Sequence, residues 1–229
     1  MKVIRTAFII ILFILTGSSL HAQDLTFSVT AHAGANLSNM DVQEIKTNPK
    51  FGYKAGVSVE FNLPKKLFIQ TGVDLTTKGA KRKWTIQGDL NGDGYFNDKV
   101  SYAENINTTY LILPIRAGYR LSVSDIIRMN LSLGPYFGYG IGGKMKSKSE
   151  GYMGTSSGET EAFSDEYRIN SFSQTALKRF DMGLSGNVGI EYQRLLLNVG
   201  YEYGFINHSR TTLSSYNNNL YLTLGYRIL

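Results

Sequence analysis

The sequence predicts an all-β fold in which eight antiparallel strands close into an up-and-down β-barrel. Three observations lead to this prediction. Apolar and polar residues alternate with a period of two along eight segments, the connections between these segments are alternately short and long, and no segment after the N-terminal region shows a convincing helical period. The composition agrees, because 24 glycines against 4 prolines suit long strands whose backbones approach closely.

The N-terminal segment is typical of a secretory signal. Lys2 and Arg5 give a positive start, residues 7–15 form an apolar run, and residues 20–22 form a cleavage site before Gln23. The run is too short for a spanning helix, and no later stretch approaches the roughly twenty apolar residues that such a helix needs. We therefore expect a signal peptide over residues 1–22 and one barrel domain over residues 23–229, which would cross a membrane by strands.

The predicted strands follow one another along residues 25–38, 51–61, 67–76, 111–119, 127–141, 180–192, 195–203 and 220–228. Each has an apolar face and a face of small or polar residues, which is the alternation of a strand with two different surroundings. In order, the apolar faces include Leu25, Phe27 and Val29; Phe51, Tyr53 and Val57; Leu67, Ile69 and Val73; Leu111, Leu113 and Ile115; Ile127, Met129 and Leu131; Phe180, Met182 and Leu184; Leu195, Leu197 and Val199; and Leu220, Leu222 and Leu224.

The connections point to an outer-membrane barrel. Segments 62–66, 122–125 and 193–194 are short, whereas 38–50, 79–105, 143–176 and 207–218 are long. Short periplasmic turns and long extracellular loops are the pattern of transmembrane β-barrels, and eight strands put both termini on the periplasmic side. Aromatic residues of the apolar faces gather at both strand ends, as interfacial girdles do. They are Phe61, Tyr119, Tyr192 and Tyr226 at the turn end, and Tyr53, Phe137, Tyr139, Phe180 and Tyr203 at the loop end.

Several short motifs, taken in order, resemble the PorT-type outer-membrane β-barrel family found in Bacteroidetes. They are GANLS at 34–38, GYKAG at 52–56, FIQTGVD at 68–74 with KGAK at 78–81, YLILP at 110–114, GPY at 134–136, FDMGL at 180–184 and YEYGFIN at 201–207. The resemblance implies an outer-membrane barrel and no particular reaction. The family's namesake assists protein secretion, and likeness of fold does not carry that role to this chain. The last residue, Leu229, departs from the pattern because it is not aromatic and is out of phase with Ile228.

The polar faces carry a balanced set of charges, which we expect to pair inside the barrel. The basic members are Lys54, Arg116, Arg120, Arg128 and Arg227, and the acidic members are Glu60, Asp74, Asp181, Glu191 and Glu202. Arg116 could reach Asp74 or Glu202. A barrel of eight strands holds little beyond its own side chains, so the sequence predicts a closed interior and no pore for large solutes. We favour mutual pairing over a proton or ion pathway, because unpaired buried charges are costly.

One loop resembles the first half of a calcium-binding loop. Asp89, Asn91, Asp93 and Asp98 supply oxygen donors around a glycine turn, which suits a hard cation. The twelfth position is Val100 instead of the usual bidentate Glu, and residues of these types also favour ordinary turns. Calcium is the one cofactor that the sequence suggests, and an acidic turn without metal is the alternative.

The sequence shows no recognisable catalytic motif. It has no cysteine, and the only histidines of the mature chain, His32 and His208, accompany no nucleophile motif. We expect a non-enzymatic protein with a structural, assembly-support or surface-interaction role in its extracellular loops, above all in 143–176, where Lys144, Lys146 and Lys148 cluster. The alternatives are a secreted soluble lipocalin-like barrel that binds an apolar ligand inside, and an outer-membrane enzyme.

The expected partners follow from this location. They are outer-membrane lipid, the barrel assembly machinery, and a surface or periplasmic protein. Positive and negative residues are spread along the chain instead of forming blocks, so the sequence predicts no binding to nucleic acid.

Overall fold

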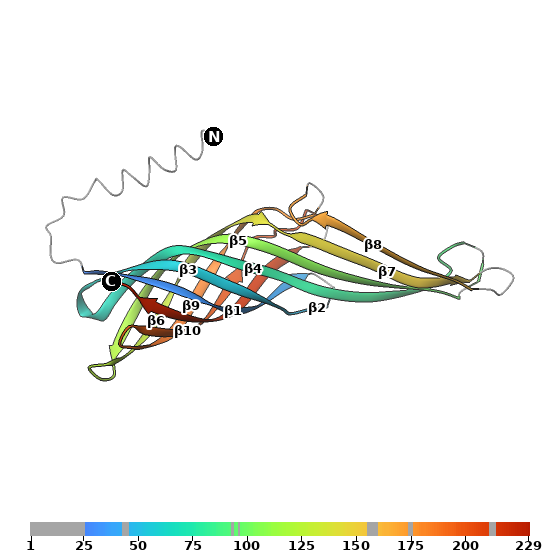
Figure 1. Cartoon of the computed structure of the whole chain (residues 1–229). Coiled ribbons are helices and arrows are strands. Elements are labelled where there is room, and N and C mark those ends of the chain that lie inside the picture. The colour runs from blue at the N-terminus through green and yellow to red at the C-terminus, as the bar shows by residue number, and fades with distance from the viewer. Residues whose placement is uncertain are drawn as a thin grey trace, which may run out of the picture.

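The computed structural model describes residues 26–42, 46–92, 94–95, 97–154, 160–173, 176–210 and 214–229, and most of these lie in β-strands (Figure 1). The strands are β1 (Phe27–Val42), β2 (Thr47–Asn48), β3 (Lys50–Asn62), β4 (Leu67–Gly88), β5 (Asp98–Ser122), β6 (Ile127–Gly142), β7 (Lys144–Gly154), β8 (Thr160–Asn170), β9 (Phe180–Tyr192), β10 (Leu195–Gly204) and β11 (Ser215–Arg227), with one 3-10 turn, η1 (Pro64–Lys66). Within these residues, no helix is long and apolar enough to cross a membrane. The predicted signal peptide lies outside the described residues.

Eight of the strands form a closed antiparallel ring in the order β4-β3-β1-β11-β10-β9-β6-β5, because β5 also pairs with β4. The first and last strands lie side by side, with Thr30 opposite Arg227. A closed ring leaves no strand edge unpaired within it. Each ring strand covers all or most of one predicted segment, although segments 25–38 and 220–228 reach beyond the start of β1 at Phe27 and the end of β11 at Arg227. The eight ring strands and their order therefore agree with the alternation, whereas β2, β7 and β8 were not predicted.

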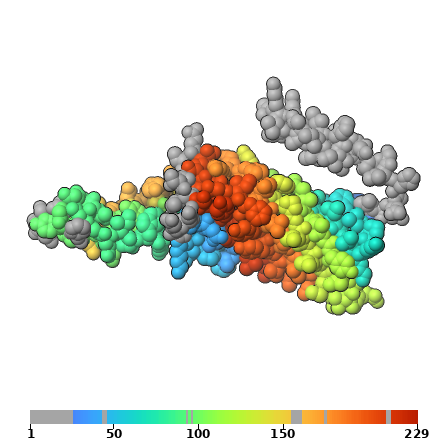
Figure 2. Space-filling view, turned by 180° about the vertical axis from the view of Figure 1, so that it is seen from behind, coloured from blue at the N-terminus to red at the C-terminus, as the bar shows by residue number. Residues whose placement is uncertain are grey.

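Three of the four segments that we expected to be long loops are mainly strand, which corrects the sequence-based expectation. Within 38–50, β1 continues to Val42, β2 is Thr47–Asn48 and β3 begins at Lys50. Within 79–105, β4 continues to Gly88 and β5 begins at Asp98, and within 143–176 the chain forms β7 and β8. Residues 80–88 and 98–106 with β7 and β8 make a four-stranded antiparallel sheet that extends beyond the ring, and we call it the projecting sheet (Figures 1 and 2). Its strands were missed because polar residues occupy both of their faces, so they lack a continuous apolar face.

The projecting sheet begins where β5 changes its neighbour. The pairing of β5 with β6 shifts register at Thr109 and Tyr110, and β6 ends at Gly142. Gly143 has a φ of 150°, which lies in the region that favours glycine, and the chain then continues as β7. From Ile106 to Lys99, β5 pairs with β7 instead of β6. The ring and the projecting sheet therefore share β4 and β5 as continuous strands.

The ring has an apolar outside and a polar inside. Leu131 and Leu224 keep 59% and 58% of their surface exposed, whereas Asp74 and Glu202 keep 1%. The alternation therefore places apolar residues outward. A lipocalin-like barrel needs the opposite orientation, with its apolar faces around a ligand, so this arrangement does not favour that alternative.

A small apolar cluster lies at the end of the ring next to the projecting sheet. It includes Met40, Ile106, Tyr110 and Phe172, and the Tyr110 and Phe172 rings meet edge to face with centroids 5.6 Å apart. This cluster lies above the polar interior and packs the base of the projecting sheet against the ring.

Gly200 leaves space for the aromatic ring of Tyr221 inside the ring of strands. Gly200 faces inward on β10 opposite Tyr221 of β11, and a Cβ atom at Gly200 would overlap the Tyr221 ring. On β9, a Cβ at Gly186 would come no closer than 3.5 Å to the nearest atom, Cδ1 of Leu133. The two glycines are therefore a matched pair, one without space for a methyl group and one with it.

We predict that Gly200→Ala lowers the free energy of unfolding by about 1–3 kcal/mol, because the added methyl group must displace Tyr221 from a packed interior. The control, Gly186→Ala, should change it by less than about 0.5 kcal/mol. Urea unfolding of both variants in detergent micelles, followed by tyrosine fluorescence, measures the difference. Equal losses in the two variants would contradict this role of Gly200.

Candidate functional site: a polar interior and a projecting sheet

Five charged side chains meet inside the ring in its half nearer the projecting sheet, and we call them the upper cluster. Lys54 Nζ lies 2.7 Å from Asp74 Oδ2 and 2.7 Å from Glu202 Oε1. Lys78 Nζ lies 3.2 Å from Glu202 Oε2 and 3.3 Å from Asp181 Oδ2. Both lysines are almost fully buried, so Glu202 links two lysines that have no access to solvent.

Neutral side chains complete the surroundings of the upper cluster. The Lys78 ammonium lies 4.5 Å from the centre of the Tyr136 ring, and Tyr136 Oη donates a hydrogen bond of 3.2 Å to Asp181. Asn219 Nδ2 donates to Glu202 at 3.1 Å. A buried ion pair is tolerated only when further hydrogen bonds use its remaining donors and acceptors, and these residues supply them.

A second group of charges, the lower cluster, lies toward the short turns. Arg227 Nη2 lies 2.7 Å from Glu191 Oε2 and 3.6 Å from Glu60 Oε1, so it joins the two carboxylates. Arg128 pairs with Glu191 at 3.1 Å, and Arg120 pairs with Glu60. All the charged residues that the sequence placed inside, except Arg116, thus form ion pairs in one cluster or the other.

Arg116 differs from the expectation that it could reach Asp74 or Glu202. Its Nη1 instead donates to Tyr221 Oη at 2.7 Å and to Ser185 Oγ at 3.3 Å, and among the described residues it forms no ion pair. Lys54 already lies between the two carboxylates. Arg116 thus lies between the upper and lower clusters, where its partners are the neutral hydroxyl groups of Tyr221 and Ser185.

The interior has little free space. The cavity at the level of Arg116 has a volume of about 20 Å³, which is room for about one water molecule. Residues from both sides of the ring line it, including Thr30, Ser58, Gln70, Asn187, Asn198 and Thr223. At this level the side chains fill the ring.

Lys78 is the charged member that the sequence analysis missed. It follows Asp74 and Thr76 on the same period-two face, and that alternation could have identified it. The predicted strand ends at Thr76 and the predicted connection begins at residue 79, so Lys78 belongs to neither of them. The structure continues β4 to Gly88, so Lys78 points into the ring.

We predict that Lys54→Met lowers the free energy of unfolding by about 3–5 kcal/mol, because Asp74 and Glu202 would lose the cation between them in a buried site. As a control, Arg168→Met removes an arginine whose side chain is 59% exposed and pairs with Glu166 at 2.8 Å. That change should alter stability by less than about 1 kcal/mol. Thermal unfolding in detergent compares the two, and a similarly small effect at Lys54 would contradict the importance of the upper cluster.

The two histidines occupy different surroundings. His32 Nε2 lies 2.8 Å from Asp74 Oδ1 inside the ring. His208, in the connection between β10 and β11, is fully buried, and its Nε2 lies 3.3 Å from Ser215 Oγ. Its backbone carbonyl accepts a hydrogen bond of 2.7 Å from the Lys178 N–H, so it ties two connecting segments together.

We predict that His208 makes the fold less stable in acid. Burial lowers the pKa of His208 to about 4 from the usual 6.5, so between these values the unfolded chain binds a proton that the folded chain does not. Stability contributed by neutral His208 should therefore be lost as the pH falls from 6.5 to 4, by up to about 3 kcal/mol. His208→Gln should remove this part of the pH dependence. Thermal midpoints of the two proteins across this range test it, and a constant difference between them would be the contrary result.

At the far end of the projecting sheet, the Asp98 carboxylate accepts backbone hydrogen bonds from Leu90, Asn91 and Gly154 at 2.7, 3.1 and 2.7 Å. Burial alone would raise the pKa of this carboxyl, but these three N–H groups hold it below its usual value. Asp98 thus fastens the turn after β4 to the end of β7.

Asp89 and Asn91 of the predicted calcium loop lie in the same turn. Asp89 accepts hydrogen bonds from the N–H groups of Gly92 and Gly94 at 2.7 and 2.9 Å, and Asp93 lies outside the described residues. No group of three or more metal-binding side chains occurs in the described part of the chain. An acidic turn accounts for these contacts, and calcium binding at Asp89, Asn91, Asp93 and Asp98 stays a prediction.

The projecting sheet has two unlike faces. On the face that continues the inside of the ring, the rings of Trp84 and Tyr102 stack 5.1 Å apart, and Arg82 lies over Trp84 and pairs with Glu104. Below them is a cavity of about 250 Å³ lined mainly by Met40, Ile106, Met145, Ile169 and Leu177. The opposite face carries lysines from β4 and β7.

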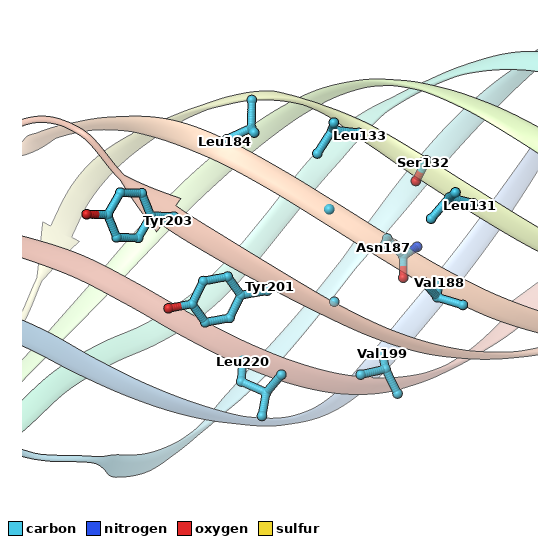
Figure 3. Close-up of a pocket in the computed structure, with 12 residues that line it drawn as sticks. Leu131, Ser132, Leu133, Leu184, Asn187, Val188, Val199, Tyr201, Tyr203 and Leu220 are labelled. Atoms are coloured by element: carbon cyan, nitrogen blue, oxygen red, sulfur yellow. The ribbon is translucent and has the colours of Figure 1, made fainter.

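The outside of the ring contains a shallow apolar groove of about 490 Å³ across β6, β9, β10 and β11 (Figure 3). It arises where Gly186 interrupts the row of outward side chains. Leucine, valine and tyrosine side chains surround it: Leu131, Leu133, Leu184, Val188, Val199, Tyr201, Tyr203 and Leu220. Both this groove and the outer surface around it are therefore apolar.

The chain matches the family described as "Outer membrane protein beta-barrel domain" over residues 21–210, and it belongs to this family. Among solved structures, it is similar to the outer membrane protein OprG from Pseudomonas aeruginosa, with a TM-score of 0.45, 12% identity, and coverage of 89% of this chain and 96% of that one.

Two further solved structures are similar. Neisserial surface protein A gives a TM-score of 0.36, 14% identity, and coverage of 88% and 98%. The attachment invasion locus protein Ail of Yersinia pestis gives a TM-score of 0.37, 13% identity, and coverage of 88% and 98%. A search of curated proteins found no match.

Proposed function

We propose that this chain is a non-enzymatic protein of the outer membrane, exported by a signal peptide over residues 1–22. In this proposal the ring spans the bilayer, the short turns face the periplasm, and the projecting sheet lies outside the cell. The observation that carries the proposal is the reversed polarity of the ring, with apolar side chains outside and paired charges inside. Hydrocarbon is the surrounding that such an outer face fits.

The dimensions of the ring support this location. A spanning strand needs about 9–11 residues when tilted. β9 has 13 residues and β10 has 10, and β9 begins and ends with the exposed aromatic residues Phe180 and Tyr192. Tyr203 on β10 and Tyr226 on β11 lie outward at opposite ends in the same way. Aromatic residues at both limits of an apolar band suit the two membrane interfaces.

The role that we favour is interaction at the cell surface through the projecting sheet, ahead of a purely structural or assembly-support role. The sheet is held on the ring by two continuous strands and presents exposed charged residues, as recognition elements on rigid scaffolds do. The motif resemblance supports a finer placement among PorT-type barrels, but we do not extend that family's secretion role to this chain. His208 Nε2 lies 3.3 Å from Ser215 Oγ, but both residues are buried, so this contact does not support an enzymatic role.

The test of location is fractionation of cells that express the full chain, followed by gel mobility of the membrane sample with and without heating. We expect the protein in the outer-membrane fraction, without residues 1–22, and with a mobility that changes on heating because the closed ring resists detergent until heated. Liposomes containing it should exclude sugars, because the interior is filled. A soluble product, or mobility unaffected by heating, would overturn the proposal, and rapid sugar entry would overturn the closed interior.

A further inference from the structure

The outward face of the projecting sheet is strongly basic. Lys81 and Lys83 on β4, Lys146 and Lys148 on β7, and Arg168 on β8 lie on this face, and we call these five residues the basic face. Their side chains are exposed or partly exposed. β4 and β7 each contribute two residues spaced two apart, and the pairing of the strands brings these four residues together with Arg168.

Strand register brings the basic residues together. Lys81 lies opposite Asn105, Asn105 opposite Lys146, and Lys146 opposite Arg168, so one row crosses four strands. The next row places Lys83 and Lys148 on either side of Ala103. Residues directly opposite one another share a face, and adjacent strands are about 4.8 Å apart.

Small side chains on β5 leave a hollow between the lysines. Asn105 and Ala103 separate the cations of β4 from those of β7, and a groove of about 370 Å³ lies here. All five residues of the basic face line this groove, together with Arg82 and two carboxylates, Glu104 and Glu166, so cations outnumber anions by six to two. The arrangement offers converging positive charges around a space large enough for a phosphate or a carboxylate group.

Neighbouring carboxylates only partly neutralise this face. Lys148 contacts Glu150, and Arg168 pairs with Glu166 at 2.8 Å. Within the part of the chain that the structure describes, Lys81, Lys83 and Lys146 form no ion pair. Three mutually repelling cations therefore lie around one groove, and an anion from another molecule would relieve that repulsion.

The position of the basic face relative to the apolar band indicates which anion it meets. On β4 the outward residues Val73 and Leu75 belong to the apolar band, and Lys81 and Lys83 follow on the same face. Thr77 is level with the aromatic residue Tyr53, whose N–H donates to Thr77 Oγ1 at 2.9 Å. Lys81 comes four residues later, about 13 Å along the strand and about 10 Å higher for a strand tilted by roughly 45°.

This height suits the headgroup layer. That layer adds about 5–8 Å on each side of the hydrocarbon core, and a lysine side chain can reach back toward it along its flexible stem. Lys81 is therefore close enough to contact lipid headgroups, and Lys146 and Arg168 lie in the same row of the sheet. The row of Lys83 and Lys148 lies one step farther along the strands.

We propose that the basic face binds the anionic headgroups of lipids in the outer leaflet, and that this contact holds the projecting sheet against the membrane surface. The proposal rests on the outer-membrane location proposed above. A lipid headgroup is favoured over a soluble polyanion because the face continues the outward surface of the ring, which membrane lipid already surrounds. Each lysine near an anionic surface strengthens binding about fivefold.

A probe placed within the groove can test the proposal. The chain has no cysteine, so Ala103→Cys gives one site for an environment-sensitive fluorophore between the lysine pairs. The folded, labelled chain in neutral detergent is titrated with phosphatidylglycerol, phosphatidylcholine, or a soluble sulfated oligosaccharide. The same titrations are repeated with Lys81→Gln/Lys146→Gln added, and with Lys65→Gln/Lys66→Gln added as a control that removes equal charge from the η1 turn.

We expect a saturable change with phosphatidylglycerol and none with phosphatidylcholine. Lys81→Gln/Lys146→Gln should raise the half-saturating mole fraction of phosphatidylglycerol roughly 30-fold, and the control pair should leave it unchanged. An equal response in all three proteins, no preference for the anionic lipid, or a response confined to the sulfated oligosaccharide would overturn the proposal.

Gel mobility with and without heating, measured on each labelled preparation, separates the two proposals. If heating does not change the mobility of the labelled parent protein, the proposal that the ring spans the membrane is overturned. If the mobility changes as expected but the fluorophore does not respond to phosphatidylglycerol, the ring stands and only the headgroup site is excluded. A variant that loses the heat-dependent mobility is replaced by the single change Lys146→Gln, for which about a fivefold shift is expected.

Discussion

The pairing of β4 with β5 is the constraint on which the rest of the structure depends. These consecutive strands pair from Leu67 opposite Tyr119 to Gly88 opposite Asp98. The first part of the pairing closes the ring, because β4 and β5 are the two ends of the row formed by the other ring strands. The remainder forms the centre of the projecting sheet, so the sheet inherits its direction and its inner and outer faces from the ring.

A closed ring of eight strands has a narrow interior, which either apolar or charged side chains can fill. Inward side chains must fill the space, and this chain fills much of it with charge, although burying charge is unfavourable unless each ion is paired. Glu202 between two lysines and Arg227 between two carboxylates meet that condition with contacts between different strands. Apolar residues would fill the space equally well. Paired charges also disfavour a register slip, since a shift by one residue would turn them toward the apolar outside of the ring.

Structural features that lie within a single strand were predicted well from the sequence. Features that depend on contacts between several strands were predicted less well. Alternation along Leu220, Leu222 and Leu224 is a local pattern, and it identified all eight ring strands and their faces. It failed in the projecting sheet, where a strand such as β7 lacks an apolar face. The partner of Arg116 was missed for another reason: the register across the ring decides which groups meet, and no segment contains that information.

The polarity of β4 reverses along its length, and this reversal connects the interior to the charged surface. Below Gly79 its outward positions are apolar, as at Val73 and Leu75, and its inward positions include Asp74 and Lys78. Above Gly79 the outward positions become Lys81 and Lys83, and the inward positions include Trp84 and Ile86 beside Arg82, which is paired with Glu104. One strand with an unbroken period of two can change polarity in this way only if its surroundings change at that level. For a ring surrounded by hydrocarbon, that level is the edge of the membrane, where the outward side chains pass from lipid tails to headgroups and water.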